Sequence, residues 1–109
     1  MVERVVHVKK DAFDAYVGRR MSGVDVRFAR FGNPFRLASE AQRGSTLTDY
    51  LGYLLTNPDV VRDARVALAE TRVLACWCAP RGGVGVDDAL VCHAQVLARA
   101  MRGDYDARS

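Results

Sequence analysis

The chain has 109 residues, of which 50% are hydrophobic and 27% are charged, a composition typical of one soluble globular domain. No apolar run approaches the roughly 18 residues that cross a bilayer, and the start, MVERVVHVKKD, lacks the apolar centre of a signal peptide. We therefore expect a cytoplasmic protein with reduced thiols, and three cysteines support this because any internal bridge would leave one over.

The positive charge is concentrated in the first part of the chain. The formal net charge is +3, and residues 1–43 carry nine Lys and Arg against five Asp and Glu, whereas residues 44–109 carry seven against eight. Fourteen of the sixteen basic residues are arginine, the type suited to bidentate contacts with phosphate and carboxylate. This distribution permits an anionic ligand such as a nucleotide or a nucleic acid, and an ordinary basic surface is the open alternative.

The first predicted elements are short strands followed by a long loop. The β-branched run of Val5, Val6 and Val8 predicts a strand over residues 4–9, and Tyr16 and Val17 predict a second, shorter one. Residues 19–38 show no helical period and contain the turn signal Gly32-Asn33-Pro34. A loop of this length in a small domain is more often functional than idle.

Two amphipathic helices follow the loop. The first is predicted by apolar residues at i, i+3, i+4, i+7 and i+8, namely Leu47, Tyr50, Leu51, Leu54 and Leu55. Asn57-Pro58 ends this helix, and Pro58 or Asp59 stands near the start of the next one. The apolar stripe of the second helix consists of Val60, Val61, Ala64 and Leu68.

The last part of the chain predicts a strand, a loop and a helix. Thr71 to Trp77 is short and apolar, as a buried strand should be, and Pro80 with RGGVG forms a loop. The final helix has Asp87 or Asp88 as its N-cap, and its stripe consists of Leu90, Ala94, Leu97 and Met101. Alternating strands and helices indicate a small layered α/β domain with a mostly parallel sheet over residues 1–103, followed by a polar tail at 104–109.

All three cysteines and one of the two histidines lie within a short stretch of the sequence. Cys76, Cys78, Cys92 and His93 supply the four thiolate and imidazole ligands that tetrahedral zinc requires. The C-x-C spacing followed by an adjacent Cys-His pair is tighter than the usual structural zinc pattern, so two alternatives stay open. Cys92, with Cys78 as second choice, is a candidate nucleophile because a helix N-terminus favours the thiolate. Otherwise the cysteines are small buried hydrophobic residues.

Whether these groups meet depends on where the final helix starts. If it begins near Cys92, the side chains of Cys92 and His93 spread from the first turn and can reach the end of the preceding strand. A start at Asp88 places them about 100° apart on a formed helix, and only one then faces the strand easily.

The glycine-rich segment APRGGVG lies between a predicted strand and a predicted helix, where α/β domains bind phosphate. Gly82, Gly83 and Gly85 would let the backbone approach an anion, and Arg81 would add charge. The segment matches neither the dinucleotide fingerprint nor the P-loop, so a flexible connector is the simpler alternative.

Five motifs occur in an order that resembles a known family. They are YVGRR at 16–20, FGNPF at 31–35, the helix at 50–55, LACWCAP at 74–80 and CHAQVL at 92–97. Together they resemble domain of unknown function 4326, which is found in phages and bacteria, many of them actinobacterial, and the resemblance spans about residues 5–100. It implies a compact α/β domain, loosely Rossmann-like, and brings no established reaction.

The resemblance also marks hallmark positions, and the polar ones are candidates for one cleft at the carboxyl edge of the sheet. The hallmark positions are Tyr16, Gly18, Arg19, Asn33, Pro34, Phe35, Cys76, Cys78, Pro80, Cys92 and His93. The predicted ligand-binding set is Tyr16, Gly18, Arg19, Asn33 and Arg81, in which the arginines meet an anion and Asn33 orients the ligand. The sequence departs from the family pattern in one place, because 13 residues separate Cys78 from Cys92 where relatives have only a few.

The leading functional expectation is a small cytoplasmic protein that binds a nucleotide or nucleic-acid-derived ligand beside the Cys/His group. If the protein is an enzyme that modifies this ligand, Cys92 or Cys78 is the nucleophile, or a zinc ion activates water. The alternative is a non-enzymatic phage or bacterial accessory protein, held together by core packing or zinc, that acts by contacting another macromolecule.

Overall fold

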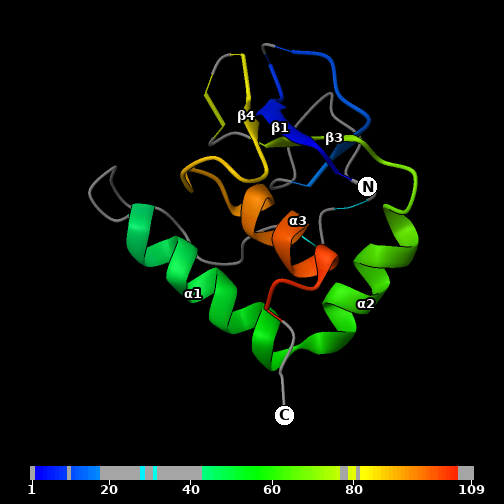
Figure 1. Ribbon diagram of the computed structural model, residues 1–109, viewed down its shortest axis with the longest axis vertical. Coiled ribbons are helices and arrows are strands. Elements are labelled where there is room, and N and C mark those ends of the chain that lie inside the picture. The colour runs from blue at the N-terminus through cyan, green and yellow to red at the C-terminus, as the bar shows by residue number, and fades with distance from the viewer. Residues whose placement is uncertain are drawn as a thin grey trace.

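The computed structural model describes residues 2–9, 11–17, 28, 31, 43–76, 79–80 and 82–105. These residues form a four-stranded sheet, in the order β2-β3-β1-β4, and three helices (Figure 1). The elements are β1 Arg4–His7, β2 Ala15–Tyr16, α1 Arg43–Thr56, α2 Pro58–Ala67, β3 Val73–Cys76, β4 Val84–Gly85 and α3 His93–Arg102. The predicted α/β class is therefore confirmed.

The sheet is mixed, with an antiparallel strand at one edge that the sequence does not predict. β3 pairs in parallel with both β1 and β2, and the register sets His7 beside Cys76. β4 runs antiparallel to β1, with Val84 beside Val5. The sequence predicts only a loop at this position, because a strand of two residues is too short to show an alternating pattern.

Alternation along the strands gives the sheet two different faces. Leu74 and Cys76 belong to the main core with the helices, whereas Ala75, Val6 and Tyr16 form a smaller cluster on the other face. Successive side chains of a strand point to opposite faces. Cys76 therefore points toward the helical side of the sheet.

Helix α3 is the central element of the domain. It packs against α1, α2, β1 and β3, and Figure 1 shows it, in orange, between the sheet and the other two helices. A helix covered on nearly all sides has few exposed residues, and the buried ones here are His93, Ala94, Gln95, Val96, Leu97, Ala98 and Ala100. The three small alanines let the neighbouring elements approach α3 closely.

Helix α3 begins later than the acidic residues predict. Its N-cap is Cys92, and Asp87 and Asp88 lie in the segment before it. The reason is Gln95, whose side chain accepts a hydrogen bond from the backbone N–H of Cys92 at 3.1 Å. In a capping box the side chain of the third helical residue binds the backbone N–H of the N-cap residue, and here this contact fixes the start of the helix.

The two predicted amphipathic helices are present, with Pro58 in the first turn of α2. Tyr50 and Leu54 of α1 are buried, while Leu55 is 57% exposed at the margin of the stripe. The predicted stripe of the second helix is buried throughout, at Val60, Val61, Ala64 and Leu68. Within the described part of the chain, no helix is both long enough and apolar enough to cross a membrane.

Asp14 joins the amino ends of β2 and β3. Its carboxylate accepts hydrogen bonds from the backbone N–H groups of Arg72 and Val73, each at 3.0 Å. These hydrogen bonds, that of Arg72 first, favour the charged form and hold the pKa of Asp14 below its ordinary value. Asp14 therefore closes the edge of the sheet opposite to the one where His7 and Cys76 lie.

We expect Gly83→Ala to destabilise the protein more than Gly82→Ala, its matched control. Both glycines have a positive φ, 81° and 86°, so both variants lose about 1–2 kcal/mol to the left-handed backbone. A Cβ at Gly83 would lie 2.8 Å from the Val5 carbonyl oxygen and from Val6 Cγ1, whereas one at Gly82 meets nothing within 4 Å. This overlap adds about 1–3 kcal/mol to the loss. Urea unfolding measures both losses, and equal values would contradict the close approach of Gly83 to β1.

Candidate functional site

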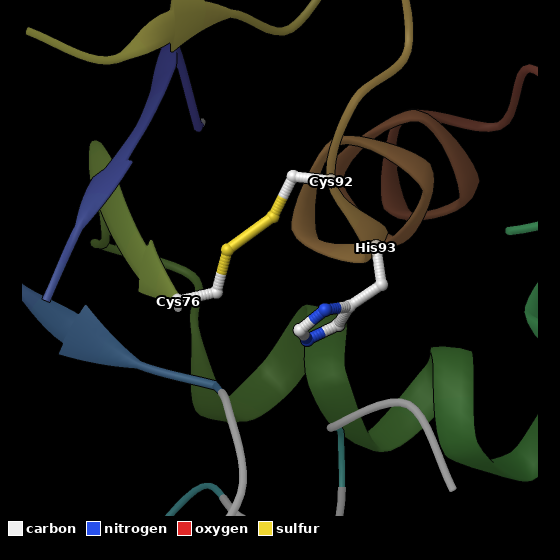
Figure 2. A group of neighbouring side chains, drawn as sticks. All are labelled: Cys76, Cys92 and His93. Atoms are coloured by element: carbon white, nitrogen blue, oxygen red, sulfur yellow. A yellow bond between two sulfur atoms is a disulfide. The ribbon is translucent and has the colours of Figure 1, made fainter. Parts of the chain in front are cut away.

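Cys76, Cys92 and His93 lie together in the interior, although they come from two different elements. Cys76 ends β3, Cys92 is the N-cap of α3 and His93 is the first residue of that helix (Figure 2). Their sulfur and imidazole nitrogen atoms lie within 4.8 Å of one another, and all three residues are buried. The structure thus brings together three of the four predicted metal ligands, because α3 starts at Cys92 rather than at Asp88.

A disulfide joins Cys76 to Cys92 across a sequence separation of 16. This bond corrects the expectation that every thiol is free, and it arises because the end of β3 and the first turn of α3 face each other. The two Cα atoms lie 7.6 Å apart. Disulfides usually span Cα separations of about 4.4–6.8 Å, so this pair is unusually wide.

The imidazole of His93 is held in a defined orientation. Its Nε2 lies 3.1 Å from the carbonyl oxygen of Val17, just after β2. A carbonyl oxygen only accepts hydrogen bonds, so Nε2 carries a proton and donates it to this oxygen. Figure 2 shows the ring beside the disulfide, with one nitrogen turned toward the sulfur atoms.

Tyr50 of α1 forms the other wall against His93. The two rings meet edge to face, with centroids 5.3 Å apart and an interplanar angle of 88°. The Tyr50 hydroxyl donates to the carbonyl oxygen of Phe31 at 2.5 Å, which fixes the tyrosine in turn. The stripe of the first predicted helix places Tyr50 in the core, but it gives no sign of this contact.

Gln95 is fully buried and holds the segment that leads into α3. Its Oε1 accepts hydrogen bonds from the backbone N–H groups of Val91 and Cys92, at 2.8 and 3.1 Å. Its Nε2 donates to three carbonyl oxygens at 3.0–3.3 Å, those of Gly85, Asp88 and Ala89. One side chain therefore sets the path of the backbone up to Cys92.

Arg99, one turn further along α3, also binds the segment before the helix. Its Nε donates to the carbonyl oxygen of Val86 at 2.8 Å, and one terminal nitrogen donates to that of Asp88 at 2.7 Å. Together with the pairing of β4 to β1, these contacts order the long interval before Cys92. The described part of the segment between β3 and α3 is therefore folded against the domain rather than left as a loose connector.

Tyr16 is the predicted ligand-binding residue that falls within the described part of the chain, and it does not lie at this cluster. Tyr16 is 1% exposed and packs on the other face of the sheet from Cys76, because adjacent strand positions alternate. Several predicted site residues lie outside the described part of the chain, namely Gly18, Arg19, Asn33, Cys78 and Arg81.

The glycine-rich turn uses its backbone groups within the chain. The N–H of Gly82 donates to the carboxylate of Asp11 at 3.1 Å, and the N–H of Gly85 donates to that of Asp88 at 2.7 Å. The Arg4 guanidinium donates to the Gly82 carbonyl oxygen. The N–H of Gly83 donates to the Pro80 carbonyl oxygen at 2.9 Å, so the N–H groups of all three predicted anion-binding glycines bind acceptors of the protein itself.

His7 lies beside the Cys/His cluster, although no sequence pattern marks it as a site residue. It ends β1 in register with Cys76, and its Nδ1 accepts a hydrogen bond from the backbone N–H of Lys9 at 3.0 Å. In the sequence, His7 appears only as a polar residue that interrupts the apolar run of the first strand. Its position beside the cluster follows from the parallel pairing of two strands that are far apart in the sequence.

Two surface hollows lined by described residues lie on the helical side of the domain. One of about 240 Å³ lies among the three helices, and one of about 260 Å³ lies between α2 and α3. Arg65 lines both and donates to the carbonyl oxygens of Ala100 and Met101. Neither hollow is lined by the Cys/His cluster.

A family model described as a domain of unknown function (DUF4326) matches residues 2–103. The matched range includes all the described helices and strands together with Cys76, Cys92 and His93. No curated protein and no solved structure matches the chain.

We expect Gln95→Ala to destabilise the protein by about 2–4 kcal/mol, because it removes the hydrogen-bond partner of five buried or partly buried backbone groups. Asn57→Ala is the matched control, since the Asn57 side-chain amide makes a single bond, to the Tyr53 carbonyl oxygen at 2.8 Å. That variant should lose about 1 kcal/mol. Urea unfolding compares the two, and similar losses would contradict the central role of Gln95.

Proposed function

The chain belongs to the family of domain of unknown function DUF4326, and we propose from its geometry that the reduced protein binds one zinc ion through Cys76, Cys92 and His93. The observation that carries the proposal is the convergence of two sulfur atoms and an imidazole nitrogen within 4.8 Å. Thiolate and imidazole are the ligands that zinc prefers. Neighbouring ligand atoms of a tetrahedral zinc site stand about 3.5–3.8 Å apart, so the two sulfurs, which are joined in the disulfide, would separate to this distance once they are reduced.

The orientation of His93 supports the proposal. A histidine that binds a metal through one nitrogen usually donates its other N–H to a carbonyl or carboxylate oxygen. The Nε2 of His93 lies 3.1 Å from the Val17 carbonyl oxygen, so Nδ1 is the nitrogen that would bind the ion. The edge contact with Tyr50 holds the ring in this orientation.

The separation of the cysteines also supports a shared ion. A Cα separation of 7.6 Å is wide for a direct bond between two sulfurs. An ion between the sulfurs replaces the S–S bond of about 2.05 Å by two metal–sulfur bonds of about 2.3 Å each, which sets the sulfurs about 3.8 Å apart in a tetrahedral site. The same backbone positions are therefore well suited to hold zinc.

Burial favours a structural rather than a catalytic ion. Cys76 and Cys92 are 0% exposed and His93 is 7% exposed, and closed zinc sites of this kind are structural. The ion would hold the start of α3 to the end of β3. The same burial gives no support to Cys92 as a nucleophile that meets an external substrate.

We expect the reduced protein to bind one zinc ion per chain and His93→Ala to weaken binding by about 100-fold or more. His7→Ala is the matched control, because His7 ends β1 at the same edge but is not one of the three clustered ligands. Elemental analysis gives the stoichiometry, and competition with a coloured chelator gives the affinity. Equal affinity in the two histidine variants would contradict the site.

The fourth ligand is tested in the same assay. Cys78 follows Cys76 by two positions in the sequence, and it is the remaining thiol of the chain. We expect Cys78→Ser to weaken zinc binding, whereas unchanged affinity would remove Cys78 from the ligand set. Chelation of the reduced protein should also lower Tm, because zinc binding contributes to the free energy of folding.

A nucleotide or related anionic ligand at the same edge is a second proposal. In its favour, the carboxyl ends of β1, β2 and β3 meet at the edge where α3 begins, the position at which Rossmann-like α/β sheets take ligands. The sequence continues from Val17 at this edge into Gly18, Arg19 and Arg20. We also propose a cytoplasmic location, where the thiols would be kept reduced.

We expect a nucleoside phosphate at 100 times its Kd to add about 2.7 kcal/mol of stability to the zinc-loaded protein, a Tm rise on the order of 10 °C. Arg19→Ala should lose this rise. Arg72→Ala should keep it, because Arg72 is exposed at the opposite edge beside Asp14 and Glu3. A flat response to a broad nucleotide panel would contradict this proposal and favour a module that contacts another macromolecule.

A further inference from the structure

We propose that the Cys76–Cys92 pair is a redox switch of the zinc site, in which oxidation by a peroxide joins the two sulfurs and releases the ion. The inference rests on the proposed zinc site and adds its regulation. The same two sulfurs are partners in a disulfide and two of the three clustered ligand atoms. They cannot serve both roles at once, because zinc binds the thiolate form.

The framework around the pair does not depend on the bond between the sulfurs. Cys76 is held by the parallel pairing of β3 with β1 and β2. Cys92 is held through its backbone N–H by Gln95, which also binds the segment before it. Breaking or forming the disulfide therefore leaves the end of β3 facing the start of α3, and the exchange is local.

The third ligand also stays in place in both states. His93 is fixed by the Val17 carbonyl oxygen and by the Tyr50 ring, and neither contact involves a sulfur atom. The imidazole beside the disulfide is thus already positioned for zinc when the sulfurs are reduced. This arrangement makes the switch reversible.

The oxidation balances with hydrogen peroxide as the oxidant. One thiolate attacks a peroxide oxygen, the O–O bond breaks, and a sulfenic acid and a hydroxide form. The second thiolate attacks the sulfenic sulfur, forms the S–S bond and displaces a second hydroxide. The two hydroxides take two protons from solvent and become water. The sulfurs lose two electrons to the peroxide, and Zn²⁺ leaves with its charge unchanged because two of its ligands are gone.

Reduction restores the zinc-binding state. A dithiol attacks the disulfide, passes through a mixed disulfide and is itself oxidised to a disulfide, which returns the two electrons to Cys76 and Cys92. Both cysteines are 0% exposed. The oxidant that fits is therefore small, and hydrogen peroxide should act faster than a bulky organic disulfide.

The test treats the zinc-loaded full chain with hydrogen peroxide in the presence of a coloured zinc indicator. We expect release of one zinc ion per chain and the loss of two of the three thiols. Alkylation followed by peptide mapping should show Cys76 linked to Cys92 and Cys78 alkylated. Dithiothreitol should then restore binding of one zinc ion.

The outcomes separate this switch from the zinc site itself. A reduced protein that binds no zinc before oxidation would overturn both proposals. A protein that binds zinc but keeps it while its thiols are oxidised, or that pairs Cys78 with another cysteine, would overturn the switch alone. Cys78→Ser is a second variant for this test, because it should still form the Cys76–Cys92 bond with peroxide, and failure to form that bond would also overturn the switch.

Discussion

The start of α3 at Cys92 is the constraint on which the rest of the site depends. Because the helix begins there, its first residues face the end of β3, and two sulfurs meet beside an imidazole. A start one turn earlier would have turned one of the two side chains away. Gln95 determines this start through its bond to the Cys92 N–H, so a buried amide outside the cluster controls its geometry.

The helices and the main strands follow from local patterns. The stripes of α1 and α2 are long enough for their period to be read, and the apolar run at 71–77 contains β3. The start of α3 does not follow, because Asp87 and Asp88 are good caps by type while the contacts of Gln95 are tertiary. β4 cannot be predicted from the sequence either, because its two residues form a strand through pairing with β1 rather than through their own propensity.

The residues of the candidate site can be predicted from the sequence, but their arrangement in space cannot. The concentration of cysteine and histidine identifies Cys76, Cys92 and His93, yet only the fold brings β3 and α3 together. Strand alternation separates Tyr16 from this group, a result that depends on which face the helices cover. The supporting contacts of Tyr50 and Gln95 cannot be predicted from the sequence either, because apolar stripes and helical glutamines occur in many helices that lie near no such site.

The way in which α3 holds the segment before it has a consequence for divergence among relatives. The side chains of Gln95 and Arg99 bind main-chain oxygens at Gly85, Val86, Asp88 and Ala89, and no side chain of that segment. Every residue type offers the same carbonyl oxygen. Homologous chains can therefore exchange a side chain such as that of Ala89 without disturbing the cysteine that follows, provided that the glutamine and the arginine are retained.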